Sequence, residues 1–295
     1  MRPLACTSLA WQAFHTTTWV LAMSRKSEFQ SQLTKFVSGL QDYVSTDDDQ
    51  WTVKGFIDVF QTVYTISSDT KIVSKILEIH IFPKILSFAR ECGYKVVLAE
   101  HQNYYPDVSF VKADDDNLIF AVDFKTTYRN PDKPHLCNGF TLGSHGKYFE
   151  ERTSTKNIQF PYADYTGHYC LGIIYDRIDS SAVDDTRTYG IDQLESITSV
   201  VRNFQFFVVE KWRIASDKGG SGNTANIGSI GNIDDILNGR GMFSKLGEDW
   251  FDDYWMNYQK ITVADAAGRT KKISNLADFV AYRGGDPSLI VAKRR

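Results

Sequence analysis

Two segments in the first hundred residues carry apolar positions at the three- and four-residue steps that are typical of an amphipathic helix. The first is residues 27–43, and its apolar positions are Phe29, Leu33, Phe36, Val37 and Leu40. The second is residues 71–92, which follow candidate capping residues at 68–70. Pro83 should kink this second helix, and Gly93 should end it. We therefore expect two helices before the chain becomes extended.

From Lys95 onward the apolar period changes to two, which indicates β-strands. Residues 95–100, 107–113 and 118–128 are predicted strands. The polar run 114–117 predicts the turn between the last two. Two later strands and two closing helices are expected at 171–178, 204–214, 252–259 and 275–282. Strands flanked by helices favour a mixed α/β domain.

Composition places the chain among ordinary globular proteins, with 42% hydrophobic and 23% charged residues. The 33 Lys and Arg against 36 Asp and Glu give a net charge of −3, which disfavours indiscriminate DNA binding but allows a local basic cleft. Four scattered cysteines lack zinc spacing and are expected to be reduced thiols. No apolar run is long enough to span a membrane, so we expect a cytoplasmic protein.

The first 22 residues are set apart from the rest. They contain one Arg and short apolar patches that the polar run HTTT interrupts, whereas a signal peptide needs a continuous apolar stretch. Met23 opens the segment MSRKSEFQ, and we expect it to be the natural start. Residues 1–22 would then be an N-terminal extension.

The residues that can carry chemistry lie on the predicted hairpin. Because side chains alternate along a strand, Asp123 and Lys125 share one face, and Val122 and Phe124 share the other. Packing poorly explains a carboxylate and an ammonium group at the end of an apolar strand. Asp107 begins the preceding strand, so two carboxylates can converge on one point. Such a pair suits a hard divalent cation with oxygen ligands.

Mg²⁺ at this pair would polarise a phosphoryl oxygen and lower the pKa of a bound water, and a nearby lysine would stabilise the developing negative charge. Pro-Asp, fifteen residues, then Asp-x-Lys is similar to the PD-(D/E)xK nuclease pattern. The same residues also fit an exposed surface ion pair. On their own they leave both interpretations open.

Five segments together resemble the EcoRV family of Type II restriction endonucleases. They occur in the family's order and at similar spacing between about Ser68 and Trp255. They are SDTK (68–71), QNYYPD (102–107), AVDFKTTY (121–128), TKNI (155–158) and GSGNTANIGSI (220–230). Several are not general catalytic signatures, so the resemblance is specific to this family.

The resemblance implies roles for four residues at the reaction centre. Asp107 and Asp123 would bind the metal at the scissile phosphate. Lys125 would position or activate the attacking water and stabilise the transition state. Glu78 would assist in metal binding or couple its helix to the site, whereas without the resemblance it would be a solvated helix residue.

The resemblance also implies contacts with the DNA backbone and the minor groove. Thr70 and Lys71 would start a helix near the phosphates, where hydroxyl and backbone N–H groups can bind. Gln102 and Asn103 would lie in a loop beneath the minor groove. Thr127 would contact a phosphate.

The Gly-rich stretch would be a recognition loop in the major groove. Gly220 and Gly222 would let the backbone approach base edges, and Asn223 would pair with adenine N6 and N7. Thr224 would place its methyl group against a thymine methyl, and Asn226 would reach towards the sugar-phosphate. Without the resemblance, this stretch would be interpreted as a flexible linker.

Three parts of the chain depart from the family. Ala225 stands where the family has a second Thr, and residues 130–139 match poorly. The segment from Gly284 to Arg295 has no secure counterpart. Its end, Lys293-Arg294-Arg295, could touch DNA phosphates or be a solvated tail, and we expect the solvated tail.

The sequence thus predicts one endonuclease domain over residues 23–295, with a restriction-endonuclease-like fold in which helices flank a central mixed β-sheet. It would contain an N-terminal dimerisation region, a catalytic hairpin at about 95–128 and a recognition loop at about 216–232.

The resemblance implies a Mg²⁺-dependent homodimer that cuts double-stranded DNA at a palindrome. The implied site is GATATC, cut at its centre to blunt ends, with a cognate DNA methyltransferase as genetic partner. The alternatives are a PD-(D/E)xK repair or nicking endonuclease and a non-cleaving sequence-specific DNA-binding protein.

Overall fold

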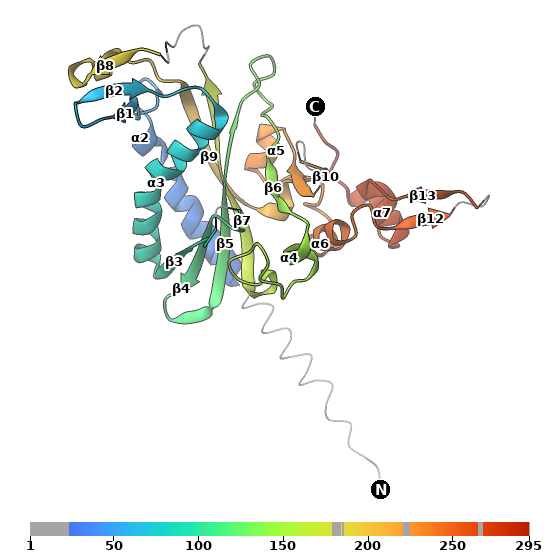
Figure 1. Cartoon of the computed structure of the whole chain (residues 1–295). Helices are drawn as coiled ribbons and strands as arrows, with labels where there is room; N and C mark the ends of the chain where they lie inside the picture. The colour runs from blue at the N-terminus through green and yellow to red at the C-terminus, as the bar shows by residue number, and fades with distance from the viewer. Residues whose placement is uncertain are drawn as a thin grey trace.

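A five-stranded mixed sheet forms the centre of the computed structural model, and helices lie on both of its sides (Figure 1). The structure describes residues 24–101, 103–178, 184, 186–220, 225–264 and 268–294. The strand order is β3-β4-β5-β7-β9, and all neighbours are antiparallel except the parallel pair of β5 and β7. The predicted mixed α/β fold is therefore confirmed. The predicted extension at residues 1–22 lies outside the described residues.

The strands of the central sheet follow the predicted pattern with shifted ends. They are β3 (Tyr94–Leu98), β4 (Val108–Lys112), β5 (Asp115–Tyr128), β7 (Tyr165–Arg177) and β9 (Val201–Glu210). The hairpin of β4 and β5 is confirmed, although β5 already begins inside the predicted turn. The last residues of the strand expected at 204–214 form the 3₁₀-helix η4 (Lys211–Ile214) instead.

Two long helices cover one face of the sheet, on the left in Figure 1. The first spans residues 24–38 and the second is α3 (Thr70–Cys92). Asp69 caps α3, and Gly93 ends it in the left-handed conformation (φ 71°), as glycine allows. The helix continues through Pro83.

Phe29 joins the two helices to the sheet. Its side chain is fully buried, and its ring stacks on Phe120 of β5 with centroids 4.1 Å apart. Phe88 from α3 and Tyr94 from β3 make edge-to-face contacts with Phe29, with ring centroids 6.4 and 5.3 Å from its own. This aromatic cluster fixes the helical layer against the hairpin strands.

The other face of the sheet packs against a second core built from short elements. The helices there are α4 (Lys147–Glu150), η1 (Tyr162–Asp164), η4, α5 (Ile233–Leu237), α6 (Glu248–Met256) and α7 (Leu276–Tyr282). A small sheet in the order β10-β11-β6 lies with them, formed by β10 (Ala215–Gly219), β11 (Asn226–Ser229) and β6 (Thr141–Ser144). Because both faces are covered, β5 is buried along most of its length.

Two small sheets lie away from the centre (Figure 1). One, at the upper left, follows α2 (Gln41–Val44) and pairs β1 (Gly55–Ile57), β2 (Thr62–Thr65) and β8 (Thr188–Gly190), with η3 (Ile191–Ser196) beyond it. The other, at the right, pairs β12 (Thr262–Ala264) and β13 (Thr270–Lys272), and η5 (Pro287–Leu289) follows α7. No helix in the described part of the chain is long and apolar enough to cross a membrane.

Phe29→Ala tests the aromatic cluster. Removing a fully buried ring that contacts two helices and the sheet should lower the free energy of unfolding by about 3–5 kcal/mol. Urea denaturation at fixed protein concentration measures this change. The control is Tyr282→Ala, since that side chain is about half exposed and should cost less than ~1 kcal/mol. Equal stability of the two variants would show that the cluster does not hold the helical layer.

Candidate functional site

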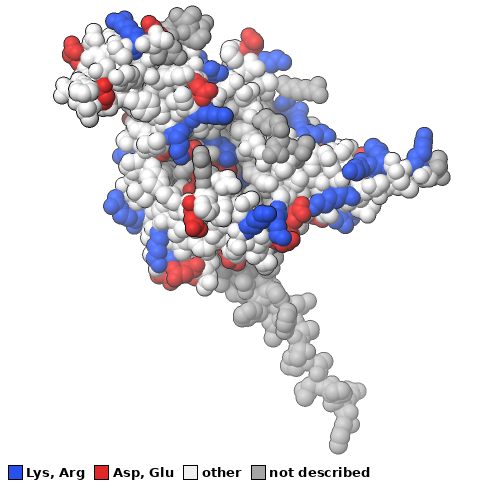
Figure 2. Space-filling model, in the orientation of Figure 1, with Lys and Arg blue, Asp and Glu red and all other residues white. Residues whose placement is uncertain are grey.

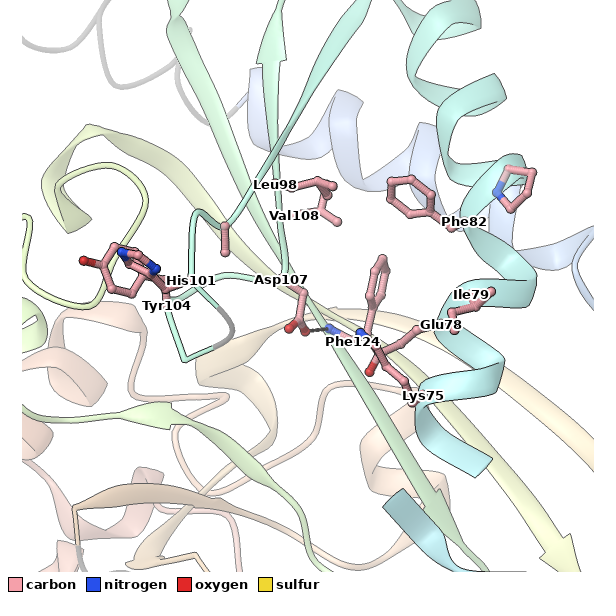
Figure 3. A pocket seen from close by; sticks show the side chains of 12 residues that line it. Lys75, Glu78, Ile79, Phe82, Leu98, His101, Tyr104, Asp107, Val108 and Phe124 are labelled. Atoms are coloured by element: carbon pink, nitrogen blue, oxygen red, sulfur yellow. Dashed lines mark hydrogen bonds and ion pairs between the residues drawn. The ribbon is translucent and has the colours of Figure 1, made fainter. Parts of the chain in front are cut away.

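The register of the hairpin places Asp107 opposite Asp123. Val108 pairs with Val122 in the antiparallel ladder, so the residue before β4 faces the residue after Val122. The backbone N–H of Phe124 donates to Asp107 Oδ2 at 2.7 Å and fixes this carboxylate (Figure 3). The two carboxylates therefore converge, as the sequence predicts.

Asp123 and Lys125 form a largely buried ion pair. The distance between Lys125 Nζ and Asp123 Oδ2 is 2.6 Å, and the two side chains are 19% and 9% exposed. Exposed ion pairs contribute little, but a buried pair carries a large desolvation cost and needs its partner. The interpretation of this motif as an exposed surface pair is therefore wrong.

Burial, and then repulsion from Asp123, raises the pKa of Asp107 to about 8, although Lys125 acts in the opposite direction. Burial also acts to lower the pKa of Lys125, but the two aspartates outweigh it and raise that pKa above its usual value. Lys125 therefore stays charged at neutral pH. The two carboxylates together carry more negative charge than one lysine neutralises, which favours a proton or a cation between them.

These three side chains line a cleft of about 460 Å³. Its other walls come from the loop before β4, from β6, from the region of α4 and from β11. Asn103 and Asn226 line the same cleft, so the structure brings five of the predicted site residues together. Their individual roles stay predictions.

The cleft also has cationic walls. Lys147 and Lys156 line it together with the aspartates, and Lys147 Nζ also pairs with Glu151 Oε1 at 3.0 Å. In Figure 2, Lys and Arg side chains border the hollow in the middle of the displayed face. A chain with a net charge of −3 therefore still has the local positive charge that a polyanion needs.

The sequence analysis gave neither of these two lysines a role. Lys156 lies in the segment TKNI that carries part of the resemblance, which was a usable signal. For Lys147 the sequence offers no comparable signal, because its place depends on how the β6 region folds over the hairpin.

Glu78 approaches Asp107 from the opposite side. It lines a second hollow, of about 410 Å³, between α3 and the hairpin, and Asp107 lines both spaces (Figure 3). Glu78 Oε2 pairs with Lys75 Nζ at 2.8 Å. Within the described residues, no three His, Cys, Asp or Glu side chains are grouped to hold one metal ion. Glu78 is thus engaged by Lys75, and both of its predicted roles, metal binding and coupling of its helix to the site, stay predictions.

At the start of α3, a side chain of the protein itself binds backbone N–H groups that a phosphate could otherwise bind. The side chain of Asp69 accepts hydrogen bonds from the backbone N–H groups of Lys71 and Ile72 at 2.9 and 3.2 Å. A phosphate would therefore have to displace a carboxylate to reach them. The Lys71 ammonium and the Thr70 hydroxyl are not affected by this cap.

Thr127 does not fit its predicted role. Its side chain is buried, and its hydroxyl donates to the carbonyl of Asn138 at 2.7 Å. A phosphate contact would need this hydroxyl at the surface, so the described geometry contradicts that prediction.

The structure describes both ends of the predicted recognition loop, at Gly220 and at Asn226. The backbone N–H of Gly220 donates to the carbonyl of Asn226 at 2.8 Å and closes the stretch between them. A Cβ atom on Gly220 would lie 2.6 Å from Thr141 Cγ2, which explains the glycine there by close approach. Four predicted DNA contacts lie outside the described residues, namely Gln102, Gly222, Asn223 and Thr224.

A buried lysine lies behind the site and was not predicted. Lys211 of η4 places its ammonium 4.6 Å from the ring centroid of Tyr105 and 4.9 Å from that of Tyr162. Burial lowers the pKa of Lys211 to about 7, against the attraction of Asp123. Lys211 is therefore partly neutral near pH 7, and only its protonated form is attracted to Asp123.

Comparison with known proteins agrees with this geometry. Residues 47–284 match the family described as Restriction endonuclease EcoRV. The chain is also 35% identical over 250 residues to the Type II restriction enzyme EcoRV of Escherichia coli. That alignment covers 84% of this chain and 98% of the relative. With a match over most of its length and a buried carboxylate pair beside a lysine in a basic cleft, the chain belongs to the EcoRV restriction endonuclease family.

Proposed function

We propose that this Type II restriction endonuclease is a Mg²⁺-dependent homodimer that cuts duplex DNA at the palindrome GATATC, at its centre, to leave blunt ends. One observation supports the proposed catalysis: Asp107 and Asp123 face each other beside Lys125, in one cleft whose walls also carry lysines. Family membership supports the substrate class.

The residues present fit Mg²⁺. This ion prefers oxygen ligands and is usually held by one or two carboxylates together with the phosphate of the substrate. Asp107 and Asp123 supply such a pair, and burial together with the charge of Asp123 raises the pKa of Asp107, so the ionised pair favours a bound cation. Bound Mg²⁺ would supply polarisation of the phosphoryl oxygen and a lower pKa for the attacking water.

The protein's own groups would do the remaining work. The Phe124 N–H and the Lys125 ammonium hold Asp107 and Asp123 in place before substrate arrives. Lys125 would then stabilise the negative charge that develops on the phosphoryl oxygens, and burial strengthens this interaction. Lys147 and Lys156 would hold the DNA backbone in the cleft.

Support for a homodimer comes from the β1–β2 hairpin. Its tip exposes large apolar side chains, with Val59 at 89% and Phe60 at 85% exposure. Phe56, Ile57 and Tyr64 add to the same hairpin, and Ile191 and Leu194 of the adjacent η3 are exposed as well. Such a patch is typical of a protein–protein interface. A twofold partner would give each half of a palindrome the same protein surface.

For specificity, we place base recognition in the Gly-rich stretch between β10 and β11. Gly220 and Asn226 hold its two ends together. The TA step at the centre of GATATC is easily unstacked, so DNA bending would add specificity without base contacts. A cognate methyltransferase of the same sequence specificity would protect the host DNA.

Asp123→Ala should abolish cleavage. Loss of one preorganised electrostatic partner lowers rates at least ~100- to 1000-fold. Digestion of phage DNA of known sequence in Mg²⁺, with mapping of the ends, measures both rate and site. The control is Asp116→Ala, because this carboxylate lies on the same hairpin but is exposed and pairs only with the exposed Lys95. A rate for Asp123→Ala within about tenfold of the parent would contradict the assigned site.

The metal-free protein should lose stability as pH rises. In the folded state the pKa of Asp107 is raised from its ordinary 3.8 to about 8. Its contribution to stability is therefore complete below pH ~4 and is lost as pH rises through about 8. Asp107→Asn removes this loss and should be ~2 kcal/mol more stable than the parent at pH 9 in EDTA.

Urea denaturation between pH 5 and 9 measures this effect. The advantage of Asp107→Asn should shrink towards pH 5, and Mg²⁺ should reduce it at pH 9 by neutralising the pair. Parallel pH profiles for the two proteins would show that folding does not raise the pKa of Asp107.

Phe60→Glu should shift the chain towards monomers. A charge at the centre of an apolar interface is costly when the interface forms. Sedimentation velocity at several concentrations measures the change, and the dissociation constant should rise at least ~100-fold. Tyr282→Glu, at a similarly exposed aromatic on α7, is the control. An unchanged sedimentation profile for Phe60→Glu would place the interface elsewhere.

A further inference from the structure

The C-terminal segment, residues 286–294, folds back onto the part of the chain that precedes the Gly-rich stretch. The family match ends at residue 284, so this segment is an addition to the shared domain. In Figure 1 the C-terminus lies beside β10 and α5. The backbone N–H of Val291 donates to the carbonyl of Met242 at 3.3 Å. The residues of this segment are mostly exposed to solvent, but this contact shows that they lie against the domain.

Lys293 forms the main contact with β10. Its ammonium lies 2.9 Å from Asp217 Oδ1 and donates to Ser216 Oγ at 3.2 Å. Asp217 is buried, with 7% of its surface exposed. A buried carboxylate that loses its cation is left with an uncompensated charge, which is strongly unfavourable. Lys293 therefore constrains where β10 can lie.

Asp217 and Ser216 connect this lysine to the rest of the C-terminal core. The hydroxyl of Tyr254 donates to the Asp217 carbonyl at 2.7 Å, and the Leu276 N–H donates to Asp217 Oδ2 at 3.5 Å. Ser216 Oγ also accepts from the backbone N–H of Lys218 at 2.9 Å. One short piece of β10 is thus bonded to α6, α7 and the C-terminal segment.

The position of β10 decides where the Gly-rich stretch begins and ends. Ala215 pairs with Ser229 and Gly219 pairs with Ile227, so β10 and β11 move together. Gly220, whose N–H donates to the Asn226 carbonyl, follows Asp217 by three positions. Asn226 in turn lines the catalytic cleft.

A second set of ion pairs, next to the contact of Lys293 with Asp217, also holds the C-terminal segment. Arg294 pairs with Asp235 at 3.0 Å and with Asp234 at 3.3 Å, both on α5. Arg240 pairs with the same two carboxylates. The segment is therefore held by α5 on one side while it presents Lys293 to β10 on the other.

We propose that the C-terminal segment acts through Lys293 as a positioning element for the β10–β11 pair and thereby sets the sequence discrimination of DNA cleavage. The inference rests on the proposed function of the Gly-rich stretch. Lys293 acts in it without contacting DNA, since its ammonium is engaged by Asp217 and Ser216.

The test compares cleavage rates on the site mapped for the parent and on every single-base-pair variant of that site. Lys293→Ala should reduce the ratio of cognate to altered-site rates about tenfold, a size typical of coupling through packed networks. Lys293→Arg keeps the charge and should retain most of the ratio. Lys35→Ala removes the same charge from the exposed face of the N-terminal helix and should change nothing.

A second pair of variants covers the case in which Lys293→Ala fails to fold. Asp217→Asn combined with Lys293→Gln removes both charges and keeps hydrogen-bonding groups. Its ratio of cognate to altered-site cleavage rates should therefore be higher than that of Lys293→Ala alone. A chain that ends at residue 285 removes the whole segment and should lose discrimination at least as strongly. Parent-like discrimination in that shortened chain would overturn the proposal.

The outcomes separate this inference from the function on which it rests. If the parent cuts a defined site and Lys293→Ala keeps the parent's ratio, only the inference fails. An equal loss on all substrates, with a weaker salt dependence, would mean that Lys293 binds phosphate instead, which also overturns it. If the parent shows no site-specific cleavage, the proposed function fails and the inference with it.

Discussion

The repulsion between Asp107 and Asp123 is the constraint on which the rest of the site depends. Two carboxylates would separate if they were free to do so, and here the antiparallel register and the bond from the Phe124 N–H keep them opposed. Burial adds to the cost of ionising the pair, and Lys125 offsets only part of the total, because burial and the charge of Asp123 still raise the pKa of Asp107. Holding the two carboxylates together therefore lowers the stability of the fold, and it leaves a position that favours a positive charge.

The central strand can bear this strain because both of its faces are packed. Val122 and Phe124 belong to the core under α3 and the N-terminal helix, and Phe29 joins those helices to the sheet. Ala121, on the face that carries Asp123, belongs to the other core. A strand held on two sides cannot relax by tilting away from its neighbour, so the carboxylates keep their geometry without a ligand.

The sequence predicted what depends on local order along the chain. Alternation along β5, the Pro-Asp before β4 and the cap and end of α3 are local patterns, and the structure confirms them. Contacts between distant segments could not be predicted in the same way. The Thr127 hydroxyl donates to the Asn138 carbonyl because the chain passes back beside β5 at residue 138. Lys147 lines the cleft because the β6 region folds over the hairpin. The capping residue Asp69 is visible in the sequence, but the sequence does not show that its carboxylate occupies the N–H groups that a phosphate would need.

Asp107 lies between the catalytic cleft and the hollow beneath α3, and it lines both of them. The cleft on one side is the space that duplex DNA would fill, whereas the hollow beneath α3 lies on the other side of the same residue. A water molecule or small ion in the hollow beneath α3 would therefore reach Asp107 without passing through the cleft, so a substrate in the cleft would leave one side of this carboxylate accessible.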